Sequence, residues 1–185
     1  MDFNQQVQNL IDSYKKKEFY ELEDKLNLYS QKPLLGAIND AVFGFYIENG
    51  QKNQCSHQAG IDVLILKRVV ELLMKIDEQR YSSKSSFEEL YTLIESNSNV
   101  SGFGPLCIYD TALRLGAVLG LAPEKVYLHR GARTGAIYVG IISEGSKAGH
   151  ISISRMPDIF HQLEPMHIEN FLCIYKDKLK KIVAG

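Results

Sequence analysis

Apolar residues recur every three or four positions along most of the chain, which is the spacing of amphipathic helices. In the first half of the chain the spacing predicts helices over residues 3–16, 19–29, 33–45 and about 56–79. The last of these stretches is the most regular, and we expect it to form one long core helix. Residues 49–54 are polar and predict a loop.

The second half of the chain carries clear helix boundary signals. Ser86 and Glu89 fit a capping box, and Pro105 suits the first turn of a helix that Gly120 would end. Residues 136–142 fit either a helix or a short strand because they are rich in β-branched side chains. Further helices are predicted over residues 156–163 and from Pro165 onward. The pattern therefore predicts a mostly α protein with a single domain over residues 1–185.

Composition and charge exclude some classes of protein. The 185 residues have a formal net charge of −1, which argues against a protein that coats nucleic acid by bulk electrostatics. Between Ser101 and Arg155, however, there are six basic residues and three acidic ones. We expect a cytoplasmic protein without a membrane partner, because no signal peptide or membrane span is recognisable in the sequence.

The cysteines and histidines give no metal signal. Cys55, Cys107 and Cys173 are far apart, none belongs to a CxxC pair, and the five histidines lack ligand spacing. We expect small buried thiols and no metal site.

The stretch Val100–Gly116 is the most informative part of the sequence. Gly102 and Gly104 permit positive φ or a close approach by another backbone, and Pro105 then opens a helix. The first amides of such a helix lack partners and carry partial positive charge, so a phosphate is a natural ligand. The alternative is a plain turn between two core helices.

Residues 87–116 resemble a helix-hairpin-helix element, in which a helix is followed by small-Gly-apolar-Gly-Pro and a second helix. The matching residues are Val100-Ser101-Gly102-Phe103-Gly104-Pro105. The resemblance implies that hairpin amides grip a nucleic-acid phosphate, with a monovalent cation on hairpin carbonyls as the one cofactor to consider, and that the backbone is contacted rather than the bases.

The wider resemblance is to the DNA glycosylase superfamily, whose all-helical fold carries this element. It implies a multi-helix orthogonal bundle with the helix-hairpin-helix region at about residues 87–120. The chemistry does not carry over: Tyr127 occupies the position of the catalytic Asp, and Leu106 lies near that of the catalytic Lys. We therefore expect binding without glycosylase activity.

A second unusual stretch, Val126–Gly135, places Tyr, His and two Arg residues among small residues. If the chain folds back here, Asp110 and His129 are candidates for acid–base catalysis, and arginines could hold an anion. The alternatives are an exposed ion pair between Asp110 and Arg114, a structural His129, and core packing of Tyr127.

Three functional hypotheses follow. The first is a protein that binds DNA or RNA backbone, with contacts from Ser101, Gly102, Gly104, Leu106, Lys125, Arg130 and Arg133. The second is an enzyme that acts on a nucleotide, a modified base or another anionic small molecule around Asp110, His129 and Arg133. The third is a helical interaction module or homo-oligomer.

Overall fold

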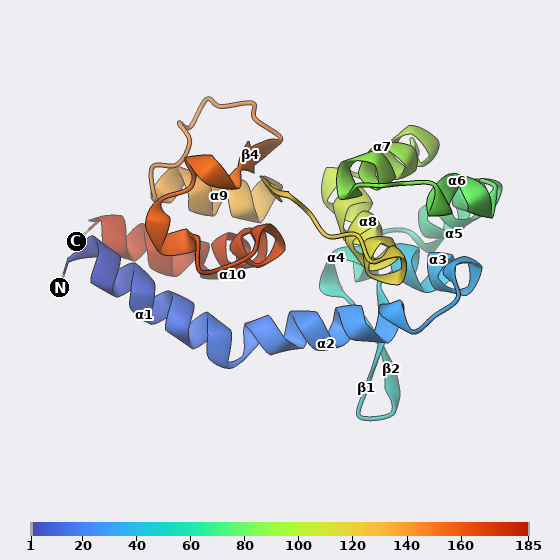
Figure 1. Cartoon of the computed structure of the whole chain (residues 1–185), viewed down its shortest axis with the longest axis horizontal. Helices are drawn as coiled ribbons and strands as arrows, with labels where there is room; N and C mark the ends of the chain where they lie inside the picture. Colours follow the sequence, from blue (N-terminus) through green and yellow to red (C-terminus); the bar gives the residue numbers. More distant parts are fainter. Residues whose placement is uncertain (1, 185) are drawn as a thin grey trace. The chain divides into compact units, whose positions relative to one another are not determined.

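Helices dominate the computed structural model, which describes residues 2–184 (Figure 1). The expectation of a mostly α protein is confirmed. The chain divides into two compact units: Leu22–Ala122, and Met1–Glu21 together with Pro123–Gly185. This division does not decide whether residues 1–185 fold as one domain, so that expectation stays a prediction. No helix among the described residues combines the length and apolar character needed to cross a membrane.

The Leu22–Ala122 unit contains most of α2 and all elements up to α8. Their bounds are α2 Glu18–Ser30, α3 Leu34–Phe43, β1 Phe45–Glu48, β2 Gln51–Gln54, α4 Ser56–Ala59, α5 Val63–Leu73, α6 Glu78–Ser82, α7 Phe87–Asn97 and α8 Pro105–Leu119. Helix α8 packs against α3 and α7 and is the most buried helix of the unit. Its core partners include Ile38, Leu90 and Ile94, all fully buried.

The other unit is built around the last helix. Its elements are α1 Phe3–Lys16, β3 Lys125–Tyr127, α9 Arg130–Tyr138, β4 His150–Ser152, the 3-10 turns η1 Ile153–Arg155 and η2 Asp158–Phe160, and α10 Pro165–Ala184. Helix α10 packs against α1, α9 and β3. Val7, Ile11, Phe171 and Leu172 are fully buried in this core.

Several predicted boundaries are confirmed. Ser86 Oγ accepts a hydrogen bond from the Glu89 amide at the start of α7. Helix α8 begins at Pro105, and Gly120 ends it in the left-handed conformation with φ +70°. These are local signals, which explains why the sequence carries them well.

The long helix expected over residues 56–79 is wrong. The stretch forms three helices, α4, α5 and α6. The side chains of Asp62 and Asp77 accept hydrogen bonds from the amides of Leu64 and Gln79, at 2.8 Å each, and so start new helices. Aspartate caps a helix end better than it continues a helix, and here the caps outweigh the apolar periodicity.

Residues 45–54 form a β-hairpin instead of a helix end followed by a loop. Strands β1 and β2 pair antiparallel, with Glu48 opposite Gln51. Asn49 and Gly50 connect them with φ of 52° and 75°, the positive values that a two-residue hairpin turn requires. The helix expected over residues 156–163 is also wrong in part, because the 3-10 turn η2 forms there in place of an α-helix.

Candidate functional site

The turn between α7 and α8 uses its two glycines differently. Gly102 has φ +92°, and a Cβ there would lie 2.5 Å from Cδ1 of Ile65 in α5. Gly104 is the N-cap of α8, with φ −83°, and a Cβ added there would meet no atom within 4 Å. The expectation of a strained or closely packed glycine therefore holds for Gly102, while the space beside Gly104 is open.

Backbone amides remain available at this turn. Phe103 is buried and its amide donates to Val100 O at 2.9 Å, which anchors the turn. The amides of Cys107 and Ile108 both donate to Gly104 O. Within the described residues no hydrogen bond is formed by four further amides of the turn, those of Ser101, Gly102, Gly104 and Leu106. Leu106 is half-buried and the other three residues are exposed, and from this we infer that the four amides are accessible to a ligand.

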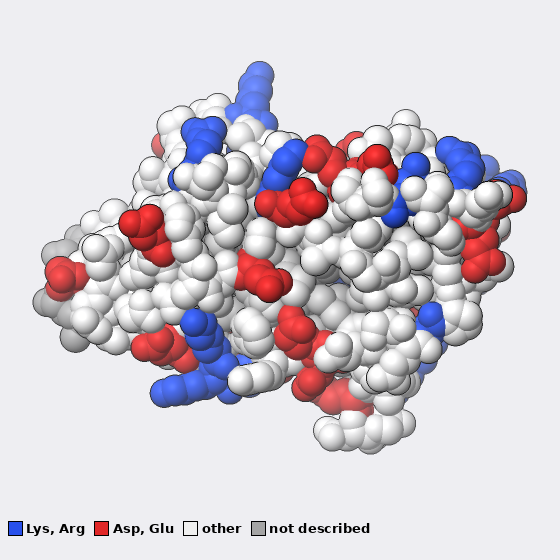
Figure 2. Space-filling view, in the orientation of Figure 1, with Lys and Arg blue, Asp and Glu red and all other residues white. Residues whose placement is uncertain are grey.

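Charge around the turn is mixed. The Leu22–Ala122 unit holds nine Lys and Arg against twelve Asp and Glu. On the face in Figure 2, acidic and basic side chains are interspersed. Arg68 lies one helical turn after Ile65, and its exposed ion pair with Glu71 spans 3.0 Å. An exposed pair of this kind contributes little, so Glu71 does not hold the guanidinium firmly.

Asp110 lies at the centre of a polar network inside the same unit. Its Oδ2 accepts from Gln58 Nε2 at 3.0 Å and lies 3.2 Å from His57 Nδ1. Arg114 Nη2 is 3.7 Å from the same oxygen, and Arg114 Nη1 donates to Ala41 O at 2.9 Å. The expected pair of Asp110 and Arg114 is therefore present, but it is largely buried rather than exposed, because α3 and α4 cover it.

The network favours an ionised Asp110. Burial opposes ionisation, but the hydrogen bond from His57 and the charge of Arg114 outweigh it, and the pKa of Asp110 lies below its ordinary value of 3.8. The hydrogen bond with Asp110 raises the pKa of His57 above its ordinary value of 6.5, although burial acts in the opposite direction. The two groups thus form a charge-assisted pair.

The second glycine-rich stretch is a helix contact. A Cβ on Gly131 would lie 2.4 Å from Cys173 Sγ, and one on Gly135 would lie 2.4 Å from Leu172 O. The small residues of α9 therefore let α10 approach closely, and no ligand is needed to explain them. Tyr127 is buried, in line with the packing alternative.

The basic residues predicted for binding have different surroundings. Arg133 donates to the backbone carbonyl oxygens of Ser146 and Ala148, so its guanidinium holds the loop before β4. Lys125 is half-buried in β3 and Arg130 is exposed at the start of α9. His129 is 8% exposed and stacks on Tyr127.

Asp110 belongs to the Leu22–Ala122 unit, whereas His129 and Arg133 belong to the other unit. Within its own unit Asp110 has a histidine partner that the sequence pattern does not indicate, His57. Gln58 and Cys55 were also missed as neighbours. More than 50 residues separate them from Asp110 in sequence, and no motif links the two segments. The acid–base role of Asp110 with His129 stays a prediction.

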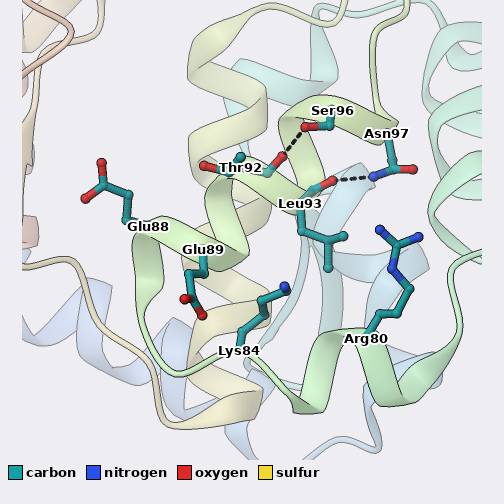
Figure 3. Close-up of a pocket in the computed structure, with 8 residues that line it drawn as sticks. All are labelled: Arg80, Lys84, Glu88, Glu89, Thr92, Leu93, Ser96 and Asn97. Carbon is teal, nitrogen blue, oxygen red and sulfur yellow. Dashed lines mark hydrogen bonds between the residues drawn. The ribbon is translucent and has the colours of Figure 1, made fainter.

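An open groove of about 380 Å³ runs along α6 and α7 (Figure 3). Arg80 and Lys84 point toward α7, where Glu88 and Glu89 balance them in charge. Ser96 Oγ and Asn97 Nδ2 already donate to backbone carbonyl oxygens of α7. The two basic and two acidic side chains that line the groove balance in charge, and we regard the groove as a solvated surface.

Comparisons of the chain with family models, with curated protein sequences and with solved structures gave no match.

Proposed function

We propose that the turn between α7 and α8 binds a phosphate of the DNA or RNA backbone in the manner of a helix-hairpin-helix element, within an orthogonal helical bundle. The carrying observation is the set of exposed amides of Ser101, Gly102, Gly104 and Leu106, which have no hydrogen-bond partner among the described residues. They precede or open α8, a helix of 15 residues, whose dipole adds partial positive charge at this end.

The shape of the turn supports this role. Contact between Ile65 and Gly102 restricts the backbone of the turn in the absence of a ligand, and the buried side chain of Phe103 anchors the turn in the core. Donors that are already oriented lose little entropy on binding. The Arg68 side chain adds a mobile positive charge one helical turn from this contact.

The charge balance limits how the protein binds. Because acidic residues exceed basic ones in the Leu22–Ala122 unit, long-range attraction to nucleic acid is weak. We expect contact with one or two phosphates, hence a salt dependence with a slope of about −1 to −2 on a double-logarithmic plot. Sequence preference should be small because amides that bind phosphate do not contact bases.

The amides, rather than a metal ion, carry this proposal. The carbonyl oxygens of Ser98, Val100 and Gly104 accept backbone hydrogen bonds. The proposal does not use the monovalent cation that the resemblance implies. Base excision is not proposed either, because Tyr127 and Leu106 occupy the positions of the catalytic residues in that resemblance.

The test compares Gly104→Asp with Gly104→Asn by fluorescence anisotropy, using short labelled duplex and single-stranded DNA at low and physiological salt. Both side chains have room at Gly104 and both are good N-caps, so both variants should fold. Only aspartate places a negative charge beside the bound phosphate. We expect Gly104→Asn to bind like the wild type and Gly104→Asp to bind about tenfold more weakly at low salt.

Arg68→Gln should weaken binding by a smaller factor and reduce the salt slope, since it removes one mobile cation. Circular dichroism confirms folding of each variant. Equal affinities for the Asp and Asn variants, or no binding by the wild type at low salt, would contradict phosphate binding at this turn.

A further inference from the structure

A partly enclosed cavity of about 80 Å³ lies in the Leu22–Ala122 unit, apart from the turn between α7 and α8. A water molecule needs only about 10–15 Å³ on this scale, so the cavity has room for a small organic molecule. Its lining comes from α2, β1, the residue before α4, and α8: Leu22, Lys25, Leu26, Tyr29, Tyr46, Cys55, Asp110, Leu113 and Arg114.

The polar side of the cavity has one unused acceptor. The contacts of Asp110 with His57, Gln58 and Arg114 all reach Oδ2. Oδ1 accepts no hydrogen bond from any described residue, yet it is not sealed among the fully buried atoms. Because Asp110 lines the cavity, Oδ1 is the carboxylate oxygen left to accept a hydrogen bond from a ligand there.

The neighbouring polar groups are already engaged. The Tyr29 hydroxyl donates to the carbonyl oxygens of Asp40 and Phe45. Arg114 donates to Ala41 O and, at 3.3 Å, to Gln58 Oε1. The network therefore leaves the ligand one strong acceptor and a thiol to contact.

The remaining walls are apolar or aromatic. Leu22, Leu26 and Leu113 contribute aliphatic surface, and the Lys25 ammonium lies 4.5 Å from the centre of the Tyr46 ring. Apolar cavity surface stays dry and gains from an apolar ligand group. The lining thus combines a carboxylate acceptor with an apolar surface.

We propose that this cavity is a binding site for a small, uncharged hydrogen-bond donor with a short apolar group, such as a primary amide or an alcohol. The donor would reach Asp110 Oδ1 and the apolar group would pack on the leucines. An anion would face the unpaired oxygen of Asp110, whereas a cation would be placed beside Arg114 and Lys25. This site does not depend on phosphate binding at the turn between α7 and α8, and we propose ligand binding there, not catalysis.

Cys55 makes the site testable because its thiol lines the cavity. Iodoacetamide and iodoacetate have nearly the same shape, but one ends in an amide donor and the other in a carboxylate. Either reagent forms an Sγ–C bond while the C–I bond breaks, so iodide leaves and the thiol proton passes to solvent. The ratio of the two rates at Cys55 therefore reports which head group the cavity accepts.

Rates are measured for each cysteine by peptide mass spectrometry on the full chain and normalised to N-acetylcysteine. Cys173, which is half-buried in the other unit, is the internal control. At Cys55 we expect the rate with iodoacetamide, after normalisation, to be about ten times the rate with iodoacetate. At Cys173 we expect the two normalised rates to be nearly equal. A ratio near one at Cys55, or no reaction there with either reagent, would overturn the proposal.

Two variants sharpen the test. In Asp110→Asn the hydrogen bond from Gln58 and the nearby charge of Arg114 favour the amide oxygen at the Oδ2 position. The amide nitrogen then takes the Oδ1 position, which should lower the ratio at least tenfold. Leu22→Phe fills the cavity and should slow both reagents at Cys55 but not at Cys173. If Asp110→Asn does not fold, Leu22→Phe and the wild-type ratio still decide. A folded Asp110→Asn protein with an unchanged ratio would contradict a role for Oδ1.

Discussion

The two glycine-rich stretches look alike in sequence but differ in what lies opposite them. At Gly131 and Gly135 the space that a side chain would need is filled by Cys173 and the backbone of Leu172. At Gly104 that space is empty and the nearby amides are exposed. Glycine spacing alone therefore does not distinguish a helix contact from a turn that is open to a ligand. The two cases are distinguished by the atoms that lie opposite each glycine, and these atoms belong to distant parts of the chain.

The largest effect is expected at the closed stretch. In Gly135→Ala the new Cβ would meet Leu172 O at 2.4 Å and other backbone atoms of that residue within about 3 Å, so a rigid helix would have to move. We expect unfolding to require about 3 kcal/mol less free energy than in the wild type. Urea denaturation measures the difference.

Gly145→Ala is the matched control for Gly135→Ala, because no atom lies within 4 Å of its Cβ. It should change the free energy of unfolding by less than about 0.5 kcal/mol. If the two variants were equally stable, the close contact between α9 and α10 would be wrong.

An intermediate effect is expected at Gly102, where the open turn is itself tightly packed. Alanine at φ +92° is strained by about 1–2 kcal/mol, and its Cβ would clash with Ile65 Cδ1. Thermal melts of Gly102→Ala should show this loss. Ile65→Val removes Cδ1, so the double variant should recover the steric part of the loss and keep the strain. Additive losses in the double variant would argue against the contact.

A smaller effect concerns the pH dependence of the unit that carries the turn. Asp110 raises the pKa of His57 in the folded chain. The pair therefore contributes its full stabilisation to the folded state at pH values below 6.5, the ordinary pKa of histidine. The stabilisation is lost as pH rises through the higher folded-state pKa. Because 45% of the His57 side chain is exposed, screening keeps the effect below about 1 kcal/mol.

Comparison of the wild type with His57→Gln by denaturation across the neutral range isolates this contribution. At mildly acidic pH the free energy of unfolding should be larger for the wild type than for His57→Gln. On the alkaline side the difference should disappear. If the stability difference between the two proteins increased with pH, His57 and Asp110 would not form the pair described.

The smallest effect is expected at Gly104. Asparagine fits its backbone conformation and caps α8 better than glycine by a few tenths of a kcal/mol. Gly104→Asn should therefore melt at or slightly above the wild-type temperature. A loss like that of Gly135→Ala would remove the contrast between the two stretches.

Much of the helical fold was predictable because local signals specify it. The Ser86 cap, Pro105 and Gly120 mark real boundaries of α7 and α8. The breaks at Asp62 and Asp77 were equally local but were hidden by an apolar pattern that continues across them. The hairpin at Asn49 and Gly50 has a known turn signal that a polar composition obscured.

The candidate sites were less predictable because they depend on contacts between distant segments. The exposed amides of the turn follow from its glycines and Pro105, which a sequence can indicate. That Asp110 meets His57 and Gln58 depends on α4 packing against α8. Neither the spacing nor the composition of these residues carries that information.

The central claim is tested most directly by nuclear magnetic resonance of the nitrogen-15-labelled full chain titrated with a short unlabelled DNA duplex at low salt. Phosphate binding at the turn predicts saturable shifts that are largest at the amides of Ser101, Gly102, Gly104 and Leu106. The same titration of Gly104→Asp should give much smaller shifts. Unchanged turn resonances, or shifts confined to Lys125 and Arg130 in the other unit, would contradict the account.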